Sequence, residues 1–402
     1  MVNYRQKLSL LDILMIIGFA SYYILPSVSD RIGILQIIFI SIAYVLFTNR
    51  FKISKEQMLY LYVFIFIGLL YTIFVNASDI SSTASNLGIK KFYSKFYQLF
   101  MMFFPIYLLK ITCKKGTDRQ KLFLILIVFA MILYVEATTR NALAINANVT
   151  RSWGNYSEEL RKLNIGHYGF VYSIPIVITL LSGIFIKTKM SLKKIVLFLL
   201  IIIQFSFLLV AQYTLAVFAA ILGMLLLIIV HFRKSRKIVI ITFIIICILP
   251  FIPFFIKLAA LHVPSESMAI RLNEVYSLFT VGDGSGYNLN GRFTLYWKSI
   301  EAFLSSPIWG NSSLDFYGHA TFLVMPAMLG LLGAVPFYYI YYHSYQRVKH
   351  EIGDNWQYYF PIFVVLIFIG FTNPIEAALP LMFITWFFGP LVISQLYGTF
   401  SW

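Results

Sequence analysis

The sequence predicts an all-α membrane protein, a polytopic helix bundle of about twelve transmembrane helices that forms one integral membrane domain over residues 1–402. Hydrophobic residues make up 60% of the chain and charged residues only 12%, which is about half the charged fraction of soluble domains. The mean hydropathy is +0.81. Apolar runs long enough to cross a bilayer as helices also recur along the whole length.

The apolar runs define the individual helices. They do not alternate between polar and apolar residues, and they are about twice the length of a transmembrane β-strand, so a barrel is excluded. One pair of runs is joined by a very tight turn around Gln212. The expected spans are 8–26, 32–48, 58–75, 96–112, 122–137, 166–186, 195–211, 213–231, 238–256, 319–342, 358–371 and 377–397.

Basic residues in short loops set the expected orientation, because lysine and arginine favour the cytoplasmic side of a membrane. The short segments 110–121, 187–194 and 231–237 are rich in both residues. Placing these segments inside makes both termini cytoplasmic. This orientation predicts a multi-pass protein of the cytoplasmic membrane.

Three long segments, about 76–95, 138–165 and 257–318, then fall on the outer face. They carry basic residues, Arg151 and Arg271 among them, that the positive-inside rule disfavours, and this indicates an anionic partner outside. A phosphate-bearing lipid head group matches a membrane-embedded surface better than nucleic acid does. The alternative is that long loops cross regardless of charge and need solvating residues.

The last outer segment is expected to form a helical cap. Residues 265–280 follow Pro264 with one apolar stripe, which predicts a helix lying on the membrane surface. A second helix is expected over 291–304, with Asn290 as its cap. Arg292 would then stand beside free backbone N–H groups, where an arginine is unfavourable unless an anion joins it. The alternative is that the Arg292 side chain only extends to the membrane–water interface and binds no anion.

Several kinds of site are not indicated. No His/Cys/Asp cluster has metal-ligand spacing and no nucleotide-binding glycine loop occurs, so neither a metal nor a cofactor is expected. The glycine-rich run at 282–286 is interpreted as a hinge. We see no internal repeat and expect no buried charges along the spans, which disfavours a proton-coupled carrier.

Residues 291–333 resemble a known family. The similarity to the shared core of bacterial O-antigen ligases and Wzy-type polysaccharide polymerases is carried by Arg292-x4-Trp297, Pro307-x-x-Gly310, Gly318-His319 and the Gly330/Gly333 pair. More loosely, Arg151-Ser-Trp-Gly154 through Gly166-His-Tyr-Gly169-Phe-x-Tyr172 is similar to an outer loop of capsule and exopolysaccharide polymerases. Two positions depart from the family pattern: Ala320 replaces an asparagine, and Gln212-Tyr213-Thr214 stands where many members have Ser-Arg.

The resemblance implies a glycosyltransferase C-type architecture and a metal-independent reaction on the outer face of the membrane. A hydroxyl of one lipid-diphosphate-linked repeat unit would attack the anomeric carbon of the other chain, and undecaprenyl diphosphate would leave. The implied partners are undecaprenyl-diphosphate-linked oligosaccharide and membrane lipid. A chain-length regulator and a flippase are further candidate partners.

Such a reaction uses cations for the leaving diphosphate, a base for the hydroxyl proton and aromatic rings for sugar faces. The predicted catalytic residues are His319, Arg292 and His167, and Glu158, Glu159 and Asp315 are alternative bases. The predicted substrate-binding residues are Arg151, Arg161, Arg271, Trp153, Trp297 and Tyr317. Three other functions stay open: a flippase or transporter of lipid-linked oligosaccharide, a ligase-type transferase, and a non-catalytic scaffold.

Overall fold

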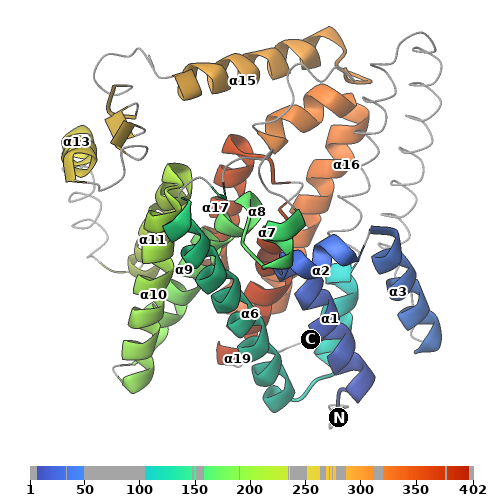
Figure 1. Ribbon diagram of the computed structural model, residues 1–402. Helices are drawn as coiled ribbons and strands as arrows, with labels where there is room; N and C mark the ends of the chain where they lie inside the picture. The colour runs from blue at the N-terminus through green and yellow to red at the C-terminus, as the bar shows by residue number, and fades with distance from the viewer. Residues whose placement is uncertain are drawn as a thin grey trace.

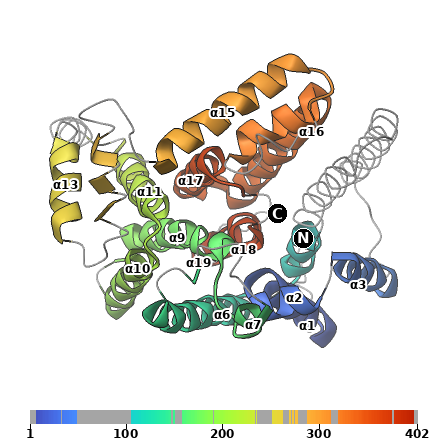
Figure 2. The same cartoon turned by 45° about the horizontal axis from the view of Figure 1, so that its top comes forward.

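The computed structural model describes residues 7–32, 34–48, 105–146, 149–150, 158–189, 191–233, 235, 251–262, 269–270, 272–273, 275–277, 287–311, 320–375 and 378–397. Within these ranges the regular structure is helical throughout, with no strand. This confirms the all-α prediction for the described part of the chain. Figures 1 and 2 show the helices gathered in one bundle, with α15 lying crosswise over one end.

Most described helices lie within a few residues of the expected spans, and α6, α13 and α16 differ from them more. The first half contains α1 (Leu10–Ile24), α2 (Pro26–Arg31), α3 (Ile34–Phe47), a helix over 105–114, α6 (Asp118–Ile145), α7 (Glu158–Lys162), α8 (Tyr168–Val171), α9 (Ile174–Lys187), α10 (Leu192–Ala211) and α11 (Thr214–Phe232). The second half contains α13 (Ile252–His262), α15 (Tyr287–Ser305), α16 (Thr321–Ile352), α17 (Trp356–Thr372), α18 (Leu379–Phe383) and α19 (Gly389–Tyr397). A short 3-10 helix, η2 (Gly353–Asn355), joins α16 to α17, and a π-helical segment, η3 (Ile384–Phe388), joins α18 to α19.

Among the described residues, five helical stretches are long and apolar enough to cross a membrane: Asp118–Ile145, Tyr168–Lys187, Leu192–Ala211, Thr214–Phe232 and Thr321–Thr372. The last of these contains both α16 and α17. Leu10–Ile24, Pro253–His262 and Leu379–Gln395 are shorter apolar helices. The span expected at 58–75 lies outside the described residues, and most of 238–256 does too, so the count of twelve stays a prediction.

Helix α9 forms the centre of the bundle. Every residue from Ile174 to Ile184 is buried, and α9 packs against α10, α11 and α17. A helix that is apolar on all sides is expected to be surrounded in this way. By contrast, α10 exposes Leu192, Ile195 and Phe198, as expected for a helix whose outer face contacts lipid.

The structure groups the short basic segments at one end of the bundle, here called the inner end. The Leu8 N–H donates to Gln120 Oε1 at 3.0 Å, and Gln395 Nε2 donates to the Asp118 carbonyl at 3.2 Å. Further contacts at this end are Lys110–Glu351, Lys187–Asn355 and Arg233–Gln357. The described residues of segments 110–121, 187–194 and 231–237 therefore share one end with Leu8 and Gln395, as the predicted topology requires.

Contacts at the opposite end, here called the outer end, join segments that were expected outside. The Ser27 N–H donates to Asn164 Oδ1 at 3.0 Å, and the Tyr213 hydroxyl donates to the Thr150 carbonyl at 2.6 Å. The tight turn at Gln212 is confirmed, because this residue ends α10 in the left-handed region with a φ of 58°. Which end faces the cytoplasm rests on the charge pattern.

Four expected boundaries were wrong. Helix α16 continues to Ile352, beyond the expected end at 342. Helix α6 continues to Ile145, so the outer segment 138–165 begins as helix, with hydroxyls of Thr138 and Thr139 bonded to carbonyls one turn back. Helix α13 reaches His262, inside the segment expected as loop from 257. Helix α15 begins at Tyr287, so Asn290 lies within it and does not cap it.

Candidate functional site at the outer end

The structure describes some of the predicted site residues and not others. His167, Arg161 and Trp297 are described, whereas only the backbone of Arg292 is. His319, Arg151, Arg271, Trp153 and Tyr317 lie outside the described residues.

The segment before His167 is fixed to α6 by hydrogen bonds. Asn164 adopts a left-handed conformation with a φ of 56°, and its carbonyl accepts the Thr138 hydroxyl at 2.7 Å. The Gly166 N–H donates to Thr139 Oγ1 at 2.6 Å. A Cβ at Gly166 would lie 2.5 Å from the ring of Phe170, so this close approach requires glycine. These contacts hold His167 at the start of α8.

Tyr168, which follows this histidine, packs against two further tyrosines. The Tyr168 and Tyr172 ring centroids are 4.6 Å apart, and the Tyr213 ring lies 5.5 Å from that of Tyr172 and 6.1 Å from that of Tyr168. The His167 ring lies 6.3 Å from that of Tyr168. We call His167, Tyr168, Tyr172 and Tyr213 the histidine–tyrosine site. The site joins the segment that precedes α9 to the turn between α10 and α11.

Two threonine hydroxyls at the same place support a binding role. Thr150 contacts Tyr213 through its carbonyl, and Thr214 follows Tyr213 in sequence. Among the residues that the structure describes, Thr150 Oγ1 and Thr214 Oγ1 are buried without a hydrogen-bond partner. Buried polar atoms are usually paired, so unpaired ones indicate a position where a ligand hydroxyl or a water bonds.

The electrostatics of the site favour a neutral imidazole. Burial, followed by the positive charge of Arg161, lowers the pKa of His167 to about 4. Desolvation and a nearby cation both disfavour the charged imidazolium. Arg161 itself is half exposed, and its Nη1 lies 2.9 Å from Asp30 Oδ1. Any anion that binds Arg161 therefore competes with Asp30.

A buried polar pair joins α6 to α10. Gln204 Nε2 donates to Glu136 Oε2 at 2.9 Å, and both side chains are almost fully buried. Arg140, one turn on, donates to the Ile203 carbonyl and to Ser206 Oγ on α10. Asp12 and Glu136 were expected near helix ends. Asp12 does lie in the first turn of α1, whereas α6 continues well beyond Glu136, to Ile145. Asp12, Lys121 and Glu136 are each at most 2% exposed.

The family-like motif at 291–333 forms a separate structure that we call the glycine junction. Helix α16 is interrupted at Gly330, which has a φ of 56° and a ψ of −167°. The N–H groups of Leu331 and Leu332 donate to the carbonyls of Pro307 and Ile308, and the Asn311 N–H donates to the Ala327 carbonyl. The Pro307–Gly310 turn thus replaces backbone hydrogen bonds that the break in α16 removes.

Two glycines make that junction possible. A Cβ at Gly310 would lie 2.3 Å from the Met328 carbonyl oxygen, and one at Gly330 would lie 2.3 Å from that of Ile308. Both also have positive φ values. Within a membrane, non-helical backbone is tolerated where protein supplies its missing hydrogen bonds. The Pro-x-x-Gly turn and Gly330 therefore have a shared structural role.

The predicted roles of Arg292 and Trp297 are modified by α15. Because α15 begins at Tyr287, Arg292 lies in its second turn and not beside the free N–H groups at its start, so that argument for an anion site was wrong. Trp297 is 62% exposed, and Ile300 and Leu304 are exposed on the same stripe. Helix α15 packs on α16 and lies away from α7 in both views (Figures 1 and 2).

The structure thus brings Arg161 and His167 together but does not join them to Trp297. Sequence reasoning missed Tyr213 as a site residue, since Gln212-Tyr213-Thr214 was noted only as a departure from the family pattern. Nothing local in the sequence links Tyr213 to Thr150 or Tyr172. The spacing of the aromatic residues Tyr168 and Tyr172 was the one signal in the sequence for this tyrosine cluster.

No protein-family model and no curated protein sequence matches this chain. Among the described residues, no three His, Cys, Asp or Glu side chains gather where they could hold a metal ion. The site itself offers a neutral histidine that can accept a proton, an arginine, unpaired hydroxyls and aromatic faces.

Proposed function

We propose that this chain is a membrane glycosyltransferase that polymerises lipid-diphosphate-linked oligosaccharide repeat units. The reaction takes place on the outer face of the cytoplasmic membrane. The acceptor hydroxyl oxygen attacks the anomeric carbon of the donor, the bond from that carbon to the diphosphate oxygen breaks, and undecaprenyl diphosphate leaves with the electron pair. The hydroxyl proton passes to a base.

The observation that carries the proposal is the histidine–tyrosine site at the outer end. It combines a half-buried neutral imidazole with the rings of Tyr168 and Tyr172, in the segment that resembles polymerases, and with the ring of Tyr213 from outside that segment. Aromatic faces can pack on sugars, and the imidazole can accept a proton. No other part of the described chain combines a histidine, an arginine and several aromatic rings at the end opposite the basic loops.

The proposed roles follow from these positions. His167 accepts or orients the proton of the attacking hydroxyl, and the negative diphosphate raises the pKa of His167 from its low resting value when the donor binds. Arg161 exchanges Asp30 for a diphosphate oxygen. Bidentate contacts from guanidinium groups suit such oxyanions. His319 and Arg292 keep their predicted roles as the alternative base and a second cation.

The test is to incubate the purified protein in detergent with a lipid-diphosphate repeat unit and to analyse the products by size. We expect a ladder of chain lengths, because polymerisation needs no membrane gradient. The ladder should persist in excess EDTA, since the predicted reaction uses no metal. Loss of the ladder in EDTA and its return with a divalent ion would contradict the metal-independent reaction.

A transporter of lipid-linked oligosaccharide is the second candidate, and the break in α16 at Gly330 favours it. Interrupted transmembrane helices commonly line the binding sites of transporters. A transporter would move a labelled lipid-linked oligosaccharide across reconstituted vesicles and would give no ladder in detergent. The polymerase would give the opposite result.

A further inference from the structure

Helix α15 is apolar on two sides, and the described part of the chain covers one of them. The covered side packs on α16, and Ser299 and Ala302 on it are buried. On the other side, Trp297, Ile300 and Leu304 are 62%, 38% and 67% exposed. Large apolar side chains that are exposed together indicate a surface that binds something.

The positions around the axis of α15 separate three sides. At about 100° per residue, Trp297, Ile300 and Leu304 fall within about 60° of one another. The adjacent sector, of about the same width, contains the exposed polar residues Thr294, Lys298, Glu301 and Ser305. The remaining side contains the buried and half-buried residues Leu295, Tyr296, Ser299, Ala302 and Phe303. A helix with one protein-facing, one polar and one apolar side is expected where protein, water and lipid meet.

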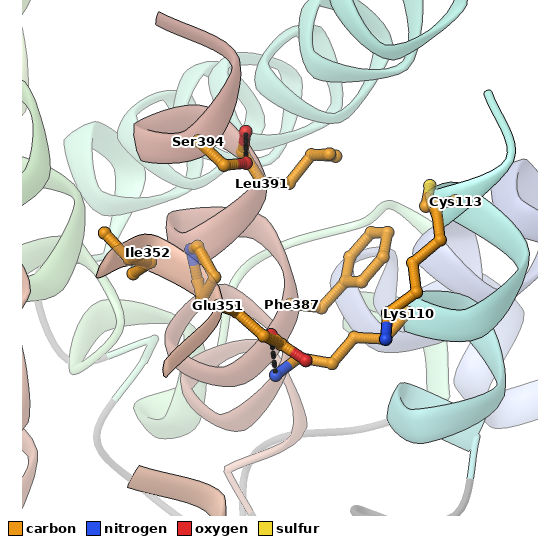
Figure 3. Close-up of a pocket in the computed structure, with 9 residues that line it drawn as sticks. Lys110, Cys113, Glu351, Ile352, Phe387, Leu391 and Ser394 are labelled. Atoms are coloured by element: carbon orange, nitrogen blue, oxygen red, sulfur yellow. Dashed lines mark hydrogen bonds and ion pairs between the residues drawn. The ribbon is translucent and has the colours of Figure 1, made fainter. Parts of the chain in front are cut away.

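The length of α16 gives the depth of its outer part in the membrane. At the inner end, Glu351 in the last turn of α16 pairs with Lys110 at 3.0 Å (Figure 3). The part of α16 that follows the break at Gly330, Leu331–Ile352, is about 33 Å long. This length is close to the thickness of about 30 Å of the hydrocarbon core. The glycine junction therefore lies at the outer boundary of that core.

Helix α15 is tied to this boundary by its following turn. It ends at Ser305, two residues before Pro307, whose carbonyl accepts the Leu331 N–H at 2.8 Å. Both views show α15 crosswise to the bundle (Figures 1 and 2). A helix that runs crosswise at this depth lies in the plane of the membrane surface.

The exposed apolar surface is also continuous with the lipid-facing side of α16. Ile308 follows α15 and is exposed, and its carbonyl accepts the Leu332 N–H at 3.3 Å. Leu332 and Val335 are exposed on the membrane-spanning part of α16. Lipid that covers these two side chains therefore reaches Ile308 and the end of α15.

We propose that the side of α15 formed by Trp297, Ile300 and Leu304 lies in the outer leaflet, at the boundary between head groups and acyl chains. Lys298 and Glu301 face the water. Tryptophan is enriched at this depth of a membrane. Trp297, which was expected to bind substrate, then contacts lipid, and α15 anchors the outer segment in the membrane plane. The proposal does not depend on the polymerase reaction.

The test measures the depth of α15 in vesicles of phosphatidylethanolamine and phosphatidylglycerol. Single spin labels are attached to the Ile300→Cys, Leu304→Cys and Lys298→Cys proteins, in which the two native cysteines are replaced by alanine. Collisions of each label with oxygen, which enters the hydrocarbon, and with a water-soluble nickel chelate are recorded. Lys298→Cys is the matched control, because this residue is exposed on the polar side of the same helix.

The labels at Ile300 and Leu304 should collide mainly with oxygen and lie about 5–10 Å into the outer leaflet, whereas the label at Lys298 should collide mainly with the chelate. Equal collision with the chelate at all three positions would place α15 in water and overturn the proposal. Few collisions with either reagent at Ile300 and Leu304 would overturn it too, because protein, such as a second copy, would then cover this side. So would oxygen contact that appears only with added polyprenyl diphosphate, which would assign this side to the donor's lipid chain.

Discussion

The histidine–tyrosine site and the glycine junction both lie at the outer end, yet they are built differently. In the first, side chains make the contacts: three tyrosine rings, one imidazole and the Tyr213 hydroxyl on the Thr150 carbonyl. In the second, the backbone makes them: three N–H groups donate to carbonyls across the break in α16. Only the side-chain contacts can be exchanged for contacts with a ligand without breaking the fold.

This difference predicts how each region responds to substitution. At the glycine junction any side chain is excluded, because Cβ atoms would lie 2.3 Å from carbonyl oxygens. At the histidine–tyrosine site we expect substitutions to lower activity by different amounts and to change stability less. Substitutions in both regions test this contrast.

Gly330→Ala should have the largest effect. Alanine meets a strained φ of 56° and the Ile308 carbonyl oxygen, so we expect the free energy of unfolding to fall by about 3 kcal/mol or more. Thermal unfolding in detergent measures this loss. Gly353→Ala is the matched control, because Gly353 has a φ of 59° but no atom within 4 Å of its would-be Cβ. It should cost only about 1–2 kcal/mol; equal losses would show that φ strain, not the junction, explains Gly330.

His167→Ala should lower the polymerisation rate about 100-fold while thermal unfolding changes little. General-base catalysis typically contributes about 10²–10⁴-fold, and a base with a low resting pKa is expected near the lower limit. The rate of ladder formation measures the effect. If the His167→Ala protein keeps more than about a tenth of the rate, His167 is not a base of that strength. His319 would then be the favoured base.

His167 should also make stability depend on pH. Its pKa of about 4 in the folded chain lies below the ordinary value near 6.5. The unfolded chain therefore binds more protons between these values, and the stability contributed by the neutral imidazole is lost as the pH falls from about 6.5 to about 4. His167→Gln should flatten this part of the curve, whereas His262→Gln, at an exposed histidine at the end of α13, should leave it unchanged.

Tyr213→Phe should have the smallest effect. It removes one hydrogen bond, from the hydroxyl to the Thr150 carbonyl at 2.6 Å, and retains the ring contacts. One such bond contributes about 1 kcal/mol, which corresponds to about a fivefold loss of activity at most. A loss as large as that of His167→Ala would mean that the Tyr213 hydroxyl itself contacts the reacting groups.

Local patterns in the sequence were sufficient for the all-helical fold, the Gln212 turn and the grouping of basic segments at one end. Each depends on hydropathy or charge over consecutive residues. The start of α15 was missed because Asn290 and Gly291 favour a helix boundary, whereas packing of α15 on α16 outweighs that local preference. The Tyr172–Tyr213 contact and the Glu136–Gln204 pair join residues far apart in the chain, and no local signal specifies them.

Photo-crosslinking tests whether the growing chain binds at the histidine–tyrosine site. The purified protein is illuminated with a lipid-diphosphate oligosaccharide that carries a photoreactive group on its first sugar, and labelled peptides are identified by mass spectrometry. We predict label in 158–172 and 212–214, with loss of label when unmodified donor competes. Label confined to the inner-end segment 105–121, or to α15 alone, would contradict the account.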